Sequence, residues 1–129
     1  MTENICPFCS LPRERFILSN PLGIVIRDGF PVSVGHTLII PRRHVSSYFD
    51  LLEDERDALL ALLEEAKRGL EKEFRPQGYN IGINDGPAAG QTVPHLHIHL
   101  IPRYQSDQAD PRGGVRWVIP EKADYWSHR

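Results

Sequence analysis

The alternation of histidines with aliphatic residues near the C-terminal third of the chain constrains the fold most. His95, His97 and His99 are each followed by a leucine or an isoleucine. This period of two is typical of a half-buried β-strand, whose side chains point alternately to opposite faces. The aliphatic face must pack on a core, so the histidine face borders a cleft, a ligand or water. Three imidazoles that titrate near neutrality therefore mark a candidate functional strand.

Length and charge limit the classes of protein and partner. The chain has 129 residues, enough for one domain with its own core. Its net charge of −2 argues against a nucleic-acid partner or an anionic membrane surface. No apolar stretch approaches the length of a membrane span, and the first residues show no signal-peptide pattern. We therefore expect a cytoplasmic location, with no nucleic-acid and no membrane partner.

The remaining apolar residues predict further strands and one long helix. The other expected strands, separated by turns rich in Asn, Asp, Gly and Pro, cover residues 15–19, 22–27, 35–41 and 79–84. The helix is expected from about Glu53 to Phe74, with Asp50 and Glu53 as a capping box. Its apolar stripe consists of Leu52, Leu59, Leu63, Ala66, Leu70 and Phe74. One helix among closely spaced strands predicts an α+β fold with a largely antiparallel sheet.

The residues before the histidine strand suggest phosphate chemistry. Gly86 and Gly90 allow backbone N–H groups to approach a ligand closely, and Gln91 and Thr92 add neutral donors. A neutral imidazole Nε2 is a competent nucleophile towards phosphorus when its other nitrogen donates to a fixed acceptor. This pattern suggests phosphoryl or nucleotidyl transfer through a phospho-histidine. The alternative is a catalytic zinc ion held by a His-x-His pair.

The two cysteines form a Cys-Pro-Phe-Cys motif at the start of the chain. Cys6 and Cys9 have no context that favours a disulfide, which leaves a metal site, redox chemistry or inert thiols. A redox pair normally follows a strand and opens a helix, and Pro12 soon after the motif argues against that context. A zinc site would need two more ligands, for which the histidines are candidates.

Several segments in register resemble the histidine triad (HIT) superfamily. Residues 95–101 match its His-φ-His-φ-His-φ-φ signature, where φ is apolar, and the likeness extends through residues 35–45 and 84–93. The resemblance implies a HIT domain over residues 4–104, with a five-stranded antiparallel sheet, one long helix and a short one. It also implies a homodimer whose sheet continues across the interface, and action on the α-phosphorus of a purine nucleotide or dinucleotide substrate.

The resemblance also implies roles for single residues. His97 resembles the nucleophile, His99 its phosphate-contacting partner, and His36 the upstream histidine behind the triad. The residues that resemble substrate contacts are Asp28, Asn84, Gly90, Gln91 and Thr92, with Ile26 and Arg27 near the base. Zinc-containing members combine a Cys-x-x-Cys motif with two histidines. The corresponding residues here are Cys6, Cys9, His44 and His95, a closed structural site that the chemistry does not require.

The loop before the triad is closest to the fragile-histidine-triad branch, which hydrolyses dinucleoside polyphosphates. The leading hypothesis is therefore hydrolysis of dinucleoside polyphosphates or nucleoside phosphoramidates. The rivals are nucleotidyl transfer to phosphate or a sugar phosphate, and nucleotide binding with weak catalysis. Residues 105–129 form an extension, with one short strand expected within 110–120, that docks on the domain, on a dimer partner or over the site. Arg112 and Arg116 there are either polyphosphate contacts or surface charges.

Overall fold

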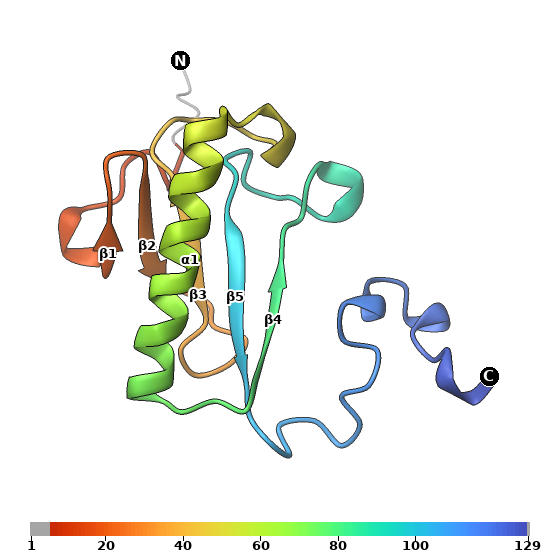
Figure 1. Cartoon of the computed structure of the whole chain (residues 1–129). Helices are drawn as coiled ribbons and strands as arrows, with labels where there is room; N and C mark the ends of the chain where they lie inside the picture. Colours follow the sequence, from red (N-terminus) through yellow and green to blue (C-terminus); the bar gives the residue numbers. More distant parts are fainter. Residues whose placement is uncertain (1–5, 129) are drawn as a thin grey trace.

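The computed structural model describes residues 6–128, which form one five-stranded sheet with a long helix on one face (Figure 1). Residues 4 and 5, where the expected domain begins, lie outside the described residues. The strands are β1 (Leu18–Ser19), β2 (Gly23–Arg27), β3 (Thr37–Pro41), β4 (Gly78–Gly82) and β5 (Ile98–Arg103). Their spatial order is β1-β2-β3-β5-β4, and every neighbouring pair is antiparallel. The predicted α+β class with an antiparallel sheet is confirmed.

The helix α1 (Glu53–Glu73) covers one face of the sheet and buries its apolar stripe there. The stripe differs slightly from the prediction: Leu62 is buried, while Leu52 is 60% exposed. The buried helix residues are Leu59, Leu62, Ala66 and Leu70, together with Glu55. They pack on a cluster that includes Val25, Ile39, Leu96, Ile98 and Leu100. The aliphatic residues between the histidines therefore belong to the core, as the alternation predicts.

The start of α1 corrects the predicted capping box of Asp50 and Glu53. The N-cap is Leu52, whose side chain has no acceptor, and its backbone N–H donates to Glu55 Oε1 at 2.8 Å. Arg43 Nε donates to the other carboxylate oxygen of Glu55, also at 2.8 Å. The Arg43 hydrogen bond lowers the pKa of the buried Glu55 carboxyl to about 2. The helix begins where this carboxylate meets both partners, and that tertiary contact left no sign in the local sequence.

Two strand boundaries differ from the predictions. Strand β1 is short because Arg13–Arg15 form a 3-10 turn after Pro12. Strand β5 begins at Ile98, so two of the three histidines precede it. In the segment before the strand, the Leu96 N–H donates to the carbonyl of Val45, a loop residue, at 2.7 Å. The short strand expected in the extension is wrong, because residues 105–128 contain no strand. The expected short helix takes the form of 3-10 helices, since every helical segment within residues 6–128 other than α1 is of that kind.

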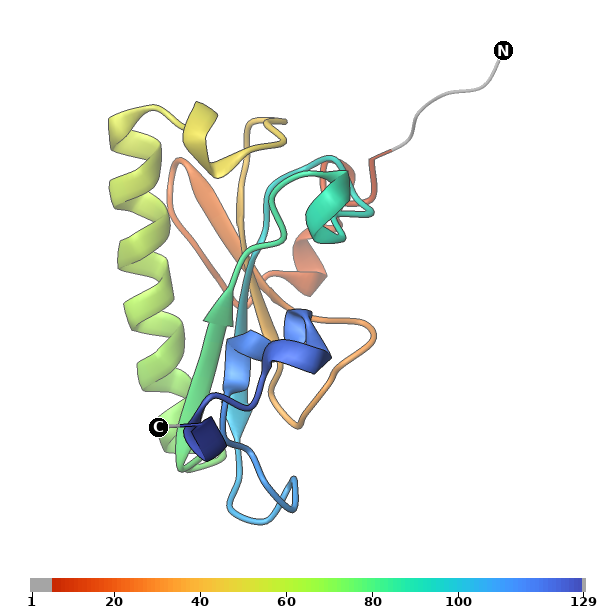
Figure 2. The same cartoon turned by 90° about the vertical axis from the view of Figure 1, so that its right-hand side faces the viewer.

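The face of the sheet opposite α1 carries a second apolar cluster. Ile24, Ile26, Leu38 and Ile40 are buried there, with Phe8, Leu11 and Phe16 packed against them. Figure 2 shows α1 on one side of the sheet and the 3-10 turn Pro87–Ala89 on the other. In the extension, the 3-10 helix Gly114–Val118 contacts β4. Within residues 6–128, α1 is too polar to cross a membrane, and no other helix reaches the necessary length.

Candidate functional site

A cleft of about 530 Å³ lies on the sheet face opposite α1. Its lining includes all eight residues predicted to be catalytic or to bind substrate: Asp28, His36, Asn84, Gly90, Gln91, Thr92, His97 and His99. Ile26 lines it too, but Arg27 does not. The Arg27 guanidinium instead donates to Thr37 and to Glu73 of α1, because alternate side chains of β2 point to opposite faces.

The sequence did not predict one wall of the cleft. It is apolar and is formed by Pro7, Phe8, Leu11, Phe30, Val32 and Leu38. Leu38 could have been found, because it alternates with the helix-facing Ile39 on β3. The other residues come from loops, whose side chains follow no periodic rule.

His97 is held in one tautomer by the backbone. Its Nδ1 lies 2.9 Å from the carbonyl oxygen of His95, which can only accept a hydrogen bond. Nδ1 of the neutral ring therefore carries the proton, and Nε2 keeps a free lone pair. That is the protonation state that a nucleophilic imidazole needs.

His36 and His99 form a hydrogen-bonded chain that gives His99 the opposite tautomer to that of His97. The Val32 N–H donates to His36 Nδ1 at 3.0 Å, so the proton of neutral His36 lies on Nε2. His36 Nε2 is 2.9 Å from His99 Nδ1, which must then accept. His99 consequently carries its proton on Nε2. The structure thus gives the cleft one imidazole that accepts and one that donates.

Burial keeps the rings of His36 and His99 neutral. It lowers the pKa of His99 to about 4, with smaller contributions from His97 and His36. Burial also lowers the pKa of His36, and it outweighs the nearby Asp28 carboxylate, whose Oδ2 is 3.4 Å from His36 Nε2. Asp28, His36 and His99 are also close enough to hold a metal, but the chain of N–H donors described above already accounts for their contacts. His97 belongs to neither of the two potential metal-binding groups among the described residues.

The low pKa of His99 predicts an acid-sensitive fold. An unfolded histidine binds a proton near its ordinary value of 6.5, whereas folded His99 resists protonation until about 4. Stability from this residue is therefore complete above pH 6.5 and declines as the pH falls towards 4. Between pH 6.5 and 4, the wild type should lose about 2 kcal/mol more unfolding free energy than His99→Asn, a variant that keeps an acceptor for His36. Urea unfolding of both proteins across the window measures it; equal pH slopes would contradict the buried neutral ring.

The loop before the triad is braced by Gln91. The Gly86 N–H donates to Gln91 Oε1 at 2.8 Å, and Gln91 Nε2 donates to the carbonyls of Ser46 and Val93 at 3.0 and 3.1 Å. Gly86 and Gly90 have φ of 98° and 95°, values that residues with a Cβ rarely adopt. The side-chain amide of Gln91 therefore fixes the shape of this loop, while Thr92 and the Gly90 backbone line the cleft beside it.

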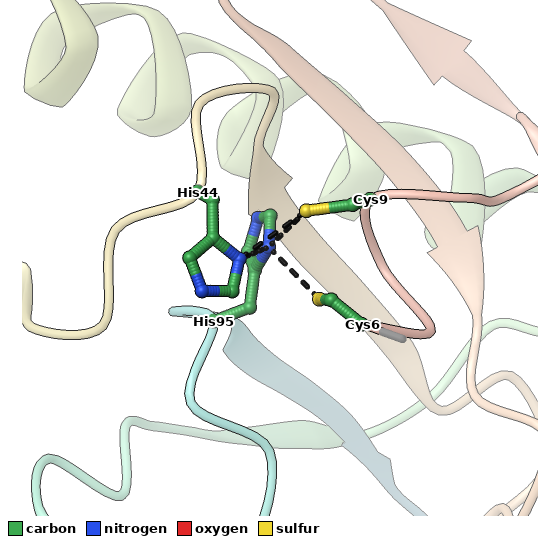
Figure 3. A group of neighbouring side chains, drawn as sticks. All are labelled: Cys6, Cys9, His44 and His95. Atoms are coloured by element: carbon green, nitrogen blue, oxygen red, sulfur yellow. Dashed lines mark hydrogen bonds between the residues drawn. The ribbon is translucent and has the colours of Figure 1, made fainter. Parts of the chain in front are cut away.

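A second cluster lies next to the cleft and consists of Cys6, Cys9, His44 and His95 (Figure 3). The two cysteines come from a turn at the start of the described chain, and His44 follows β3. Arg43 donates two hydrogen bonds to Glu55 of α1, and this contact fixes the position of the neighbouring His44. His95 is fully buried, and burial lowers its pKa.

The geometry of this cluster fits a tetrahedral metal ion. Cys6 Sγ and Cys9 Sγ lie 3.3 and 3.5 Å from His95 Nδ1, and the two imidazole Nδ1 atoms are 3.1 Å apart. Bonds of 2.0–2.3 Å to a tetrahedral zinc ion would place neighbouring ligand atoms about 3.3–3.8 Å apart. His95 Nε2 donates to the Pro41 carbonyl at 2.8 Å, so Nδ1 offers a lone pair to the cluster. The four residues could hold one metal ion.

The two arginines of the extension lie outside the cleft lining. Arg112 pairs with Asp110 at 2.9 Å, and its guanidinium lies 4.4 Å from the centre of the Trp126 ring. Arg116 donates to the carbonyls of Lys122 and Ala123 and stacks on Tyr125. Their contacts hold the extension together, which favours a structural role over polyphosphate binding.

Comparison with known proteins identifies the family. A sequence profile of the HIT domain matches residues 12–106. The chain belongs to the HIT family. The bis(5'-nucleosyl)-tetraphosphatase (asymmetrical) of Schizosaccharomyces pombe is 44% identical over 77 residues, 60% of this chain and 42% of that protein. The AP-4-A phosphorylase of Mycobacterium tuberculosis is 34% identical over 111 residues, 78% of this chain and 55% of that protein.

A solved structure of a histidine triad family protein supports the fold. The crystal structure of a Zn-bound histidine triad family protein from Mycobacterium smegmatis superposes with a TM-score of 0.72 at 32% identity, covering 81% of this chain and 79% of that one. The five-stranded antiparallel sheet with one main helix is thus a HIT fold. The named relatives process dinucleotides, so this chain belongs to a family of nucleotide-processing enzymes.

Proposed function

We propose that this HIT protein hydrolyses dinucleoside polyphosphates at the α-phosphorus through a nucleotidyl-histidine intermediate on His97. The observation that carries the proposal is the opposite protonation of two neighbouring rings. His97 presents a bare Nε2 and His99 presents a protonated one, and both residues line the same cleft. A nucleophile beside a fixed donor is the arrangement that phosphorus chemistry requires. Nucleoside phosphoramidates, which react at the same phosphorus, are the second substrate class.

The reaction proceeds in two steps, nucleotidylation of His97 and hydrolysis of the intermediate. His97 Nε2 attacks the α-phosphorus; a P–N bond forms, the P–O bond to the leaving nucleotide breaks, and the leaving group departs as an anion. The ring becomes cationic, and the His95 carbonyl that accepts from Nδ1 stabilises that charge. Water then attacks the phosphorus, the P–N bond breaks, and one water proton passes to solvent. His99 Nε2–H donates to the phosphoryl oxygens in both steps.

The rest of the cleft suits a purine nucleotide. The apolar wall offers a surface for a base, and the Asp28 carboxylate can accept from ribose hydroxyls. Asp28 Oδ1 accepts the Phe30 N–H at 2.8 Å, which orients the carboxylate at the edge of that wall. Asn84 and Thr92 provide neutral donors for phosphate oxygens and the leaving group, while the Gly90 N–H donates within the loop to the Pro87 carbonyl at 3.0 Å.

The metal and the second copy of the chain complete the proposal. Cys6, Cys9, His44 and His95 would hold zinc as a closed Cys₂His₂ site, which links three segments and leaves no position for water. The metal would be structural, because the hydrolytic steps need none. Strand β4 lies at the edge of the sheet; the extension contacts it without pairing with it as a strand, and Ile81 is 51% exposed, which supports the homodimer that the family resemblance implies.

A substrate panel tests the function. We expect the purified protein to convert diadenosine tetraphosphate to AMP and ATP, with label from isotopic water appearing in one product. Adenosine phosphoramidate in the same panel measures the second substrate class. Added inorganic phosphate should leave the products unchanged. Capture of the nucleotide by phosphate would instead favour a transferase, and AMP binding without turnover of any substrate would contradict the proposed hydrolase.

A further inference from the structure

The turn that carries the two cysteines also forms part of the cleft wall. Phe8 lies between Cys6 and Cys9 in the sequence, and its side chain lines the cleft. Figure 3 shows the same turn directing both thiols towards His44 and His95. One short segment therefore borders the metal cluster on one side and the proposed nucleotide cleft on the other.

The Phe8 ring joins the two sites through direct contacts. Its centre is 5.0 Å from that of His97, with an interplanar angle of 68°, and 5.9 Å from that of His95, at 89°. Both are edge-on aromatic contacts, which depend on the relative placement of the rings. Phe8 also packs on the buried cluster that contains Ile26 and Leu38. A shift of this ring would therefore change the cleft wall and the surroundings of the nucleophile together.

Few polar contacts hold the turn in place without a metal. Within the described part of the chain, no backbone hydrogen bond joins residues 6–11 to the sheet. The polar contacts of its thiols are those to imidazole nitrogens, such as the 3.2 Å contact between Cys9 Sγ and His44 Nδ1. Thiols form weak hydrogen bonds. Metal–ligand bonds would replace these contacts with a rigid link to two other segments.

We propose that the metal in this cluster positions Phe8 against His97, so that metal and nucleotide bind cooperatively. The inference rests on the proposed function, since it takes the cleft to be the nucleotide site. Both ligands favour the same placement of one side chain. By thermodynamic linkage, each then raises the affinity for the other by the same factor, expected here to be about tenfold.

The test measures zinc affinity with and without nucleotide. The full-length, zinc-loaded protein competes with a chromophoric chelator, in buffer and in saturating AMP. In the wild type, AMP should tighten zinc binding about tenfold. In Phe8→Ala the factor should fall to near one. Phe8→Leu retains an apolar contact with the sheet, is less disruptive to folding, and should give an intermediate factor.

Two controls make the outcome decisive. Phe49→Ala removes a phenylalanine that is 82% exposed and outside the cleft, and it should keep the wild-type factor. A factor near one in a wild-type protein that turns over substrate would overturn this inference alone. A wild-type factor retained in both Phe8 variants would also overturn it. A wild type that neither binds AMP nor turns over substrate would refute the proposed function, and this inference with it.

Discussion

Replacing His97 by alanine should lower the turnover of diadenosine tetraphosphate by about 10³-fold or more. The variant lacks the only ring of the triad that has both a place in the cleft and a lone pair free to attack. AMP should still bind within a few-fold of the wild-type affinity, because the apolar wall and the loop remain. Initial rates and calorimetric binding measure the two effects separately.

Two further measurements on His97 sharpen this prediction. Acid quenching during turnover should trap a nucleotidylated wild-type chain and an unmodified His97→Ala chain. His128→Ala is the matched control, because His128 lies in the extension and outside the cleft lining, and its turnover should be unchanged. Wild-type turnover in His97→Ala would refute nucleophilic catalysis by this residue.

Loss of the metal should have the largest effect on stability. Purified protein is expected to contain about one zinc ion per chain, and Cys6→Ser should contain almost none. The ion would link the first described turn to His44 and to the buried His95. Removing it should lower the free energy of unfolding by about 3–6 kcal/mol and the Tm by about 10–20 °C. Metal analysis and thermal unfolding, with and without a chelator, measure both quantities.

A histidine that is not a proposed ligand provides the control for the metal prediction. His44→Gln should lose zinc and stability as Cys6→Ser does, whereas His128→Gln should retain both. Protein that contains no metal, and that unfolds identically with and without chelator, would refute the zinc site.

The sequence predicted those parts of the fold that follow from local periodicity. The apolar stripe of α1 and the alternation around Leu96, Ile98 and Leu100 both correspond to buried residues. The errors occur where a distant partner decides the local structure. The helix cap is Leu52 rather than Asp50, because Glu55 accepts from the Leu52 N–H and is buried against Arg43. Strand β5 starts only at Ile98, because Leu96 pairs with a loop carbonyl. Neither partner can be read from the neighbouring residues.

The candidate site was predictable for residues with distinctive chemistry and unpredictable for the others. Histidines and cysteines in a spaced pattern point to ligands or catalysis from sequence alone, and the structure gathers them into two adjoining groups. Phe8 gave no such signal, because a phenylalanine between two cysteines could face the core or solvent equally well. Arg27 was placed near the base by resemblance, although its position on β2 directs it towards α1.

The tautomers described above have a consequence for how freely the sequence around the site can diverge. The proton positions on His36, His95 and His97 are set by main-chain atoms: the N–H of residue 32 and the carbonyls of residues 41 and 95. Every amino acid supplies a carbonyl, and every one except proline supplies an N–H. Substitutions at positions 32 and 41 can therefore change the side chains there while the proton positions on His36, in the cleft, and on His95, in the metal cluster, stay the same.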